Sequence, residues 1–187
     1  MFVSRRVLLK KLSGKVELGR IKTGIVRIGF GDIPLFDCRK ARTVLCLSGK
    51  LVFNGAAEIG PGCQLGIVGE LICGDRFAIT GFSLIATKQS ITFGNNVMLS
   101  WDVSVIDHDW HDICDEKGIL LNPPRPVFVG DDVWVCCQAL ILKGCTIKNG
   151  VIVAAGTTVT GSIDASNAII GADSRLRVLR SNVFWKR

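Results

Sequence analysis

The second half of the chain repeats a six-residue pattern of apolar and polar positions. From Val127 it reads VFVGDD, VWVCCQ, ALILKG, CTIKNG, VIVAAG, TTVTGS and IDASNA. Apolar residues at positions one and three give the alternation of a short strand, and the Gly, Asn, Asp and Ser residues that follow favour a turn. The third positions form one aliphatic column: Val129, Val135, Ile141, Ile147, Val153, Val159 and Ala165. The pattern predicts a solenoid in which three such blocks close one triangular turn.

The same pattern runs upstream with less regularity. Two-residue slips separate its blocks, and the inner column there comprises Leu47, Phe53, Ile59, Leu65, Cys73, Ile79, Ile85, Phe93, Leu99 and Val105. We predict an all-β parallel β-helix of about six turns from roughly Leu45 to Ala172, with almost no α-helix before the extreme C-terminus. Residues 1–187 form a single domain in this interpretation, with an N-terminal cap at 1–44 and a basic tail at 173–187.

One segment interrupts the repeat. Val105 and Val129 both belong to the inner column and lie 24 positions apart, whereas one repeat step needs six. The remaining eighteen residues must leave the solenoid, which predicts a protruding loop at about 106–126. Long loops are uncommon in compact domains and often carry function. This loop contains both histidines of the chain, His108 and His111.

Composition narrows the class of protein. The chain is 48% hydrophobic, yet it contains no apolar run long enough for a membrane span or a signal peptide, so we expect a soluble cytoplasmic protein. Its eight cysteines include no CxxC pair and are expected to be free thiols, with Cys63, Cys73 and Cys145 buried as small apolar residues. The net charge of +7 gathers at the chain ends and lacks interleaved aromatics, so a nucleic-acid partner is not expected.

These motifs together resemble the left-handed β-helix hexapeptide-repeat acyltransferases, close to the maltose, galactoside and capsular-polysaccharide O-acetyltransferases. The resemblance covers about 130 residues and rests on the column of sixes, the loop IDHDWHDI, the stretches VGDDVW and AAGTTVT, and the tail RLRVLRSNVFW. It implies the left hand of the helix, acetyl-CoA as co-substrate, and a homotrimer with the site between adjacent solenoids. Trp101 and Trp134, predicted at outward or corner positions, also favour an oligomer.

The chemistry of acyl transfer to a hydroxyl requires a base, and histidine has the side-chain pKa nearest neutrality. Maltose-type relatives read DHNH in the loop, which places the family's histidine on His108, whereas capsular relatives read DTDFH, which places it on His111. Both assignments stay open at this point. Asp107 or Asp109 is expected to hold the imidazole in its reactive tautomer.

The resemblance also assigns binding residues. Trp110 and Gly81 are candidates for acceptor binding, although the galactoside enzymes carry an asparagine at the position of Gly81. Cys137 replaces a serine of the family, Gly161 replaces the lysine that follows the threonine, and Arg175 replaces a proline of the tail. The residues expected to border acetyl-CoA are Trp134, Cys137, Ala155, Thr160, Arg177 and Arg180.

The sequence therefore predicts an O-acetyltransferase that moves an acetyl group to a carbohydrate hydroxyl in the biosynthesis of a capsule, exopolysaccharide or lipopolysaccharide. The alternatives are an N-acyltransferase acting on an amino sugar and a non-catalytic structural or assembly protein. A γ-class carbonic anhydrase needs three histidine ligands for zinc, and this chain has two, so no metal is expected.

Overall fold

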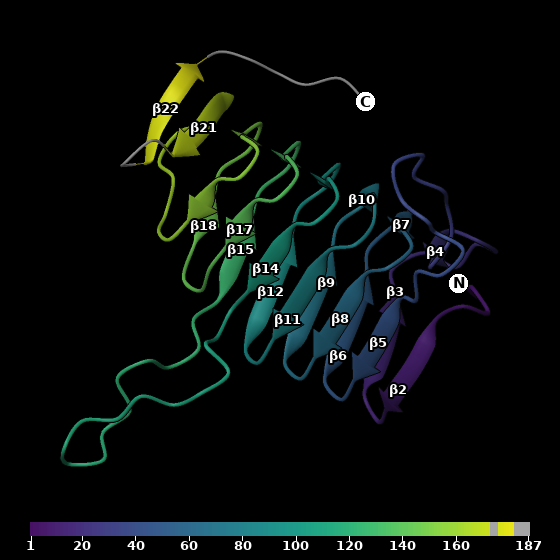
Figure 1. Ribbon diagram of the computed structural model, residues 1–187, viewed down its shortest axis with the longest axis horizontal. Coiled ribbons are helices and arrows are strands. Elements are labelled where there is room, and N and C mark those ends of the chain that lie inside the picture. Colours follow the sequence, from purple (N-terminus) through teal and green to yellow (C-terminus); the bar gives the residue numbers. More distant parts are fainter. Residues whose placement is uncertain (173–175, 182–187) are drawn as a thin grey trace.

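The computed structural model describes residues 1–172 and 176–181, and they form a left-handed parallel β-helix with three sheets (Figure 1). The chain passes from one sheet to the next at each corner, so the three sheets make the faces of a triangular prism. No segment of these residues is helical, and none therefore offers a helix that is long and apolar enough to cross a membrane.

Each sheet collects one strand from every turn. Sheet A contains β1 (Phe2–Val3), β4 (Val26–Ile28), β7 (Ala57–Ile59), β10 (Phe77–Ile79), β13 (Met98–Leu99), β16 (Trp134–Val135), β19 (Ile152–Val153), β21 (Ala168–Ala172) and β22 (Leu176–Ser181). Sheet B contains β2 (Leu8–Leu12), β5 (Val44–Leu47), β8 (Gln64–Ile67), β11 (Leu84–Thr87), β14 (Ser104–Ile106), β17 (Leu140–Ile141) and β20 (Thr158–Val159). Sheet C contains β3 (Lys15–Leu18), β6 (Lys50–Phe53), β9 (Glu70–Cys73), β12 (Ser90–Phe93), β15 (Val127–Val129) and β18 (Thr146–Ile147).

The register explains the slips in the upstream sequence. Leu84 pairs with Ser104, twenty positions on, whereas Val135 pairs with Val153, eighteen positions on. The two extra residues of each upstream turn lie at the corner between sheets B and C, as Ser48–Gly49, Val68–Gly69 and Lys88–Gln89. The hexapeptide period is therefore interrupted at one corner only.

The inner columns form the core as predicted, because alternate residues of each short strand point inward. Ala165 is the exception and is only half-buried. Val153 pairs with Ile170, seventeen positions on, so one residue is lost in the last turn and Ile170 takes the inner place. The column prediction was wrong at Ala165 for this reason.

The solenoid extends further in both directions than the hexapeptide pattern indicates. Strands β1 to β4 lie within residues 1–44, the segment predicted as a cap, and they extend all three sheets. At the other end β22 pairs antiparallel with β21. The described part of sheet B has seven strands, one more than the six turns predicted.

The predicted loop leaves the solenoid between β14 and β15 and protrudes well beyond it (Figure 1). Its outer part is a hairpin, in which Cys114 bridges Leu120 and the backbone N–H of Leu121 donates to the carbonyl of Ile113 at 2.7 Å. Its base closes where the N–H of Arg125 donates to the carbonyl of Asp107 at 2.9 Å. The loop boundaries agree with the prediction of 106–126.

Candidate active site

Asp107 belongs to a column of inward-facing residues in sheet B that is apolar in the early turns and polar in the later ones. Leu47, Ile67, Thr87 and Asp107 occupy the same inner place in successive turns, and the first two are fully buried aliphatic residues. Asp107 is 0% exposed, and the Thr87 hydroxyl donates to its Oδ2 at 2.7 Å. A buried carboxylate is tolerated only when hydrogen bonds replace its lost hydration, so this pair requires further donors.

The further donors are backbone N–H groups at the corner between sheets B and C in the preceding turn. In the two preceding turns, both N–H groups of the corner pair donate to the carbonyl of the next turn: Ser48 and Gly49 to Ile67, then Val68 and Gly69 to Thr87. At the third turn, the N–H groups of Lys88 and Gln89 donate to the carboxylate of Asp107 instead, each at 2.8 Å. The Asp107 side chain thus takes over the role of a backbone carbonyl at the point where the chain departs into the loop.

His108 follows directly and is 5% exposed. Its Nδ1 lies 2.8 Å from Oδ1 of Asp107. The other three partners of this carboxylate are all donors, so its oxygens accept and Nδ1 carries the proton. The imidazole is held with its lone pair on Nε2, which is the tautomer that a general base needs.

The Nε2 atom of His108 is buried and has no hydrogen-bond partner among the described residues. The ring of Trp110 packs against the imidazole edge to face, with ring centroids 4.6 Å apart. Trp110 itself is 57% exposed and has a positive φ of 64°, a conformation that costs a non-glycine residue free energy. A buried acceptor without a donor is also unfavourable, and a hydroxyl group is a donor that would satisfy it.

Asp109 has a different role from Asp107. It lies on the loop surface, where it accepts hydrogen bonds from the ammonium of Lys143 and from Asn122 Nδ2, the latter at 2.9 Å. The Lys143 ammonium, followed by the Asn122 amide, lowers the pKa of the Asp109 carboxyl. Asn122 also donates to the carbonyl of His111 at 2.8 Å, so Asp109 anchors the loop to the β17–β18 corner and does not contact the His108 ring nitrogen.

The two histidines that the sequence left as alternatives differ in their surroundings, and so do the two acids. His108 is buried against a carboxylate, whereas His111 is exposed on the loop. Among the two acids, Asp107 contacts the imidazole. Alternation along the extended loop puts His108 and Trp110 on one side, in agreement with the contact between their rings.

Several other residues singled out from the sequence lie at the opposite edge of sheet B. Gly81, Trp101, Cys137 and Ala155 stack in one column at the corner between sheets A and B, as the register of the adjacent strands requires. Trp134 lies beside this corner on β16, and its Nε1 donates to Ser100 Oγ at 3.0 Å. Cys137 is half-buried and Ala155 is exposed.

Gly81 and Thr160 differ from Cys137 and Ala155 in their surroundings. Gly81 is buried, and a Cβ there would meet Ile33 Cδ1 at 2.6 Å and the carbonyl oxygen of Pro61 at 2.8 Å. The segment between β4 and β5 covers this place, so the position that carries the acceptor-binding asparagine in the galactoside enzymes is closed to a side chain. Thr160 is exposed and follows β20, at the same corner as His108 but two turns further along.

Arg177 and Arg180 lie on β22, where their backbones pair with Gly171 and Ile169. Their side chains lie outside the described part of the structure, as do Arg175 and the rest of the tail beyond Ser181. Trp101 needs no second chain to cover it, because Phe36 packs against it with ring centroids 6.4 Å apart and against Phe82 at 4.5 Å.

The chain resembles known acetyltransferases in sequence. Residues 126–161 match the model of the bacterial transferase hexapeptide (six repeats). The chain is 26% identical over 140 residues to the lipopolysaccharide biosynthesis O-acetyl transferase WbbJ of Escherichia coli, covering 68% of this chain and 71% of that protein. It is 29% identical over 98 residues to the galactoside O-acetyltransferase of the same species, covering 51% of this chain and 46% of the relative.

Solved structures share the fold. The polySia specific acetyltransferase NeuO superposes with a TM-score of 0.64 at 16% identity, covering 99% of this chain and 89% of that chain. A hexapeptide-repeat acetyltransferase from Vibrio cholerae, complexed with acetyl coenzyme A, gives 0.54 at 20% identity over 67% of each chain. The N-acyltransferase AntD from Bacillus cereus, in complex with dTDP and coenzyme A, gives 0.56 at 16% identity over 96% and 83%.

The chain is similar to hexapeptide-repeat acetyltransferases in sequence and in fold.

Sequence reasoning missed the residues that hold the site together. Thr87, Lys143 and Asn122 were not candidates, although all three contact Asp107 or Asp109. One signal was available for Thr87, since it is a polar residue in an otherwise aliphatic inner column. Among the described residues, no three His, Cys, Asp or Glu side chains gather as metal ligands would.

Proposed function

We propose that this acetyltransferase moves the acetyl group of acetyl-CoA to a carbohydrate hydroxyl, with His108 as general base and Asp107 as its orienting carboxylate. The observation that carries the proposal is the buried Asp107–His108 pair, in which a proton is fixed on Nδ1 and Nε2 lacks a partner. A solenoid that only served as a scaffold would gain nothing from an unsatisfied buried nitrogen, which costs free energy.

The proposed chemistry is a direct transfer. The acceptor hydroxyl donates its proton to His108 Nε2 as its oxygen forms a bond to the acetyl carbon. The carbon–sulfur bond breaks, and the thiolate of the donor leaves and takes up the proton that His108 accepted, which returns the imidazole to its neutral form. Asp107 stabilises the positive charge that the imidazole acquires, because both of its oxygens already face donors and stay in place.

Trp110 is proposed to receive the acceptor. Its ring lies against the imidazole, and more than half of its surface is exposed. An aromatic face suits the C–H face of a sugar ring. A sugar that stacks on the exposed part of Trp110 would bring a hydroxyl close to Nε2 of His108. Gly81 offers no such contact because Ile33 covers it.

The donor is proposed to lie along the corner between sheets A and B. Small residues, Cys137 and Ala155, border this corner, and a Cβ built on Gly156 would meet nothing within 4 Å, so the corner leaves room for an extended chain. Trp134 lies at its side. Thr160, Arg177 and Arg180 stay predictions from the resemblance, and so does a cytoplasmic location.

A screen of sugar acceptors with labelled acetyl-CoA tests the proposal. Transfer of label to a hydroxyl compound by the wild type is the expected result, and the names of WbbJ and NeuO support a polysaccharide role. Transfer to the amine of an amino sugar would instead favour N-acylation, the activity that the name of AntD states. Thioester consumption at the same background rate by wild type and His108→Ala would reject catalysis.

Assembly is the next prediction. His108 lies at one edge of sheet B, and Trp134, Cys137 and Ala155 lie at the other, so a site that joins them is proposed to form between chains. The outward column of sheet A, formed by Ala78, Met98, Trp134, Ile152 and Ile169, is also only partly buried in one chain. We expect light scattering to give three times the 20.2 kDa chain mass, and a mass near one chain at micromolar concentration would contradict this.

Cysteine chemistry gives a further prediction. Burial raises the pKa of Cys63 to about 11 and that of Cys73 further, so these thiols are inert. Cys114 is the exposed thiol of the loop, and a covalent route would need it. We expect Cys114→Ser to leave kcat unchanged and intact-protein mass spectrometry to find no acetyl adduct during turnover. An acetylated Cys114 peptide together with an inactive serine variant would establish the covalent route instead.

A further inference from the structure

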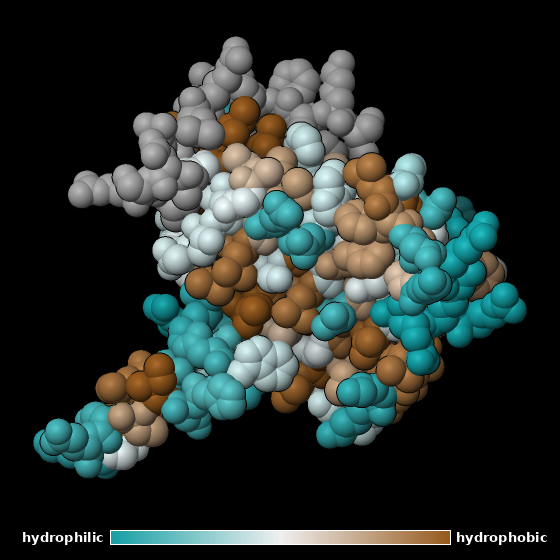
Figure 2. All heavy atoms as spheres, viewed as in Figure 1, coloured by the Kyte–Doolittle hydropathy of each residue, from teal (hydrophilic) through white to brown (hydrophobic). Residues whose placement is uncertain are grey.

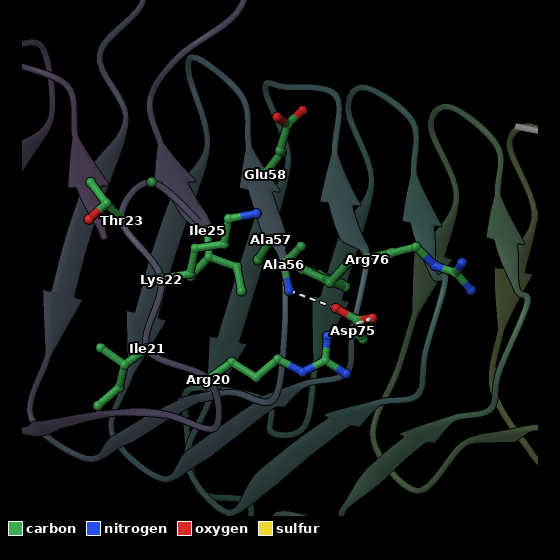
Figure 3. A pocket seen from close by; sticks show the side chains of 12 residues that line it. Arg20, Ile21, Lys22, Thr23, Ile25, Ala56, Ala57, Glu58, Asp75 and Arg76 are labelled. Atoms are coloured by element: carbon green, nitrogen blue, oxygen red, sulfur yellow. Dashed lines mark hydrogen bonds and ion pairs between the residues drawn. The ribbon is translucent and has the colours of Figure 1, made fainter.

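A cavity lies in the first turns of the solenoid, at the corner between sheets C and A. Its volume is about 720 Å³, within the range of small-molecule sites. The connection between β3 and β4 forms one wall, and the corners that precede β7 and β10 form the floor (Figure 3). His108 lies at a different corner, between sheets B and C, so this cavity is separate from the proposed acetyl-transfer site.

The walls are fixed by backbone hydrogen bonds. The N–H of Gly19 donates to the carbonyl of Phe53 at 2.8 Å, and that of Ala57 donates to the carbonyl of Ile25 at 3.0 Å. Between these ties the chain turns with a hydrogen bond from Ile25 N–H to the Lys22 carbonyl at 3.2 Å. These hydrogen bonds fix the connection between β3 and β4, and with it the wall of the cavity.

Charged side chains of both signs line the cavity. Its basic residues are Arg20, Lys22 and Arg76, and its acids are Glu58 and Asp75. Glu58 pairs with Arg27, outside the cavity lining, at 3.3 Å. Asp75 is held by the N–H of Ala56 at 2.8 Å, which is the first cause of its lowered pKa.

Two of the cations are available to a ligand. Arg20 Nη1 lies 3.9 Å from Asp75 Oδ2, a long and exposed contact, since two thirds of the arginine side chain is exposed. The Lys22 ammonium has no ion pair within the described residues. Figure 3 shows both side chains entering from the same connection, with Arg20 beside Asp75, while Arg76 points away toward later turns.

Most of the rest of the lining is apolar, with Thr23 as the other polar side chain. Ile25, Ala57 and Phe77 line the floor, and Ile21 stands at the edge, 97% exposed. An apolar floor beside a pair of cations suits a molecule with a C–H surface and one anionic group. A guanidinium and an ammonium that line the same cavity can each bind a carboxylate through charge-assisted hydrogen bonds.

We propose that this cavity binds a saccharide that carries a carboxylate, separately from the acetyl-transfer site. The choice of a saccharide rests on the proposed function, whereas the anionic group rests on the cavity alone. For an acidic polymeric acceptor, the cavity would hold one part of the chain while another part meets His108.

Calorimetry on the full chain, without acetyl-CoA, tests this inference. The probes are a hyaluronan tetrasaccharide, which carries carboxylates, neutral cellotetraose, and glucose 6-phosphate. The tetrasaccharide is expected to bind and cellotetraose to bind far more weakly. Binding of glucose 6-phosphate alone would overturn the proposal in favour of a phosphate ligand, and equal binding of the neutral sugar, or binding of no probe, would overturn it outright.

Variants locate the binding. Replacing Arg20 and Lys22 together by alanine is expected to weaken tetrasaccharide binding by about 10- to 100-fold, because two charged hydrogen bonds are lost. Ala56→Phe fills the cavity without changing its charge and should weaken binding as well. Lys10→Ala, an exposed lysine of β2, is the matched control and should bind as the wild type does.

The same variants separate this inference from the proposed function. Unchanged tetrasaccharide affinity in the double variant and in Ala56→Phe would remove the cavity from consideration, whatever the transferase activity. Conversely, a protein that binds the tetrasaccharide through Arg20 and Lys22 but transfers no acetyl group would retain this site and lose the proposed reaction.

Discussion

Replacing His108 with alanine is expected to lower kcat by about 10² to 10⁴, the usual contribution of a general base. The imidazole is held by Asp107 with its lone pair on Nε2. Among the described residues, no other side chain of the loop has a buried nitrogen or oxygen without a hydrogen-bond partner. Affinity for acetyl-CoA, measured by calorimetry, should change little, because Trp134, Cys137 and Ala155 lie at the other edge of sheet B.

His111→Ala is the matched control, since it removes an imidazole from the same loop. His111 is exposed, and its backbone makes the loop hydrogen bonds, so its side chain is expendable in this account. We expect kcat close to that of the wild type. A loss in His111→Ala as large as that expected for His108→Ala, with His108→Ala active, would transfer the role to His111.

Asp107→Asn is expected to lower both activity and stability. Each carboxylate oxygen faces two donors: Lys88 N–H and His108 Nδ1 at Oδ1, Thr87 hydroxyl and Gln89 N–H at Oδ2. An amide NH₂ group placed on either side meets donors, at a cost of about 1–3 kcal/mol for each buried group left unsatisfied. If the NH₂ faces His108, the proton moves to Nε2 and the base is lost, so kcat should fall by about 10² or more.

Two variants separate orientation from general damage to the loop. Thr87→Val keeps the shape and removes one of the four bonds to Asp107, which should cost about 1 kcal/mol of unfolding free energy and leave most of kcat. Asp109→Ala removes the contact with Lys143 at the loop surface and should affect kcat less than Asp107→Asn does. If Asp109→Ala proves the more damaging, Asp107 does not orient the base.

The repeat predicted the fold because a period of six is a local property of the chain. Strand alternation and turn residues repeat in each block, and burial follows from that alternation, as the fully buried column from Val129 to Val159 shows. The loop was equally predictable, since Val105 and Val129 are too far apart in sequence for one step. Where the period weakens, at residues 1–44 and near Ala165, the pattern placed neither the first strands nor the slip in the last turn.

The site was predictable only in part, because its contacts join distant turns. Asp107 meets Thr87, twenty positions earlier, and Asp109 meets Lys143, thirty-four positions later. Which of the two acids holds the imidazole depends on where sheet B ends, and the sequence alone does not fix that residue. The covering of Gly81 by Ile33 depends on the path of the irregular segment between β4 and β5, which follows no repeat.

The most direct measurement of the central claim is the transfer of labelled acetyl groups from acetyl-CoA to a panel of sugars by wild type, His108→Ala and His111→Ala, run side by side. The account predicts a labelled sugar ester with the wild type and with His111→Ala, and at least about a hundredfold less with His108→Ala. Equal product from all three proteins, or no labelled sugar from any of them, would contradict it.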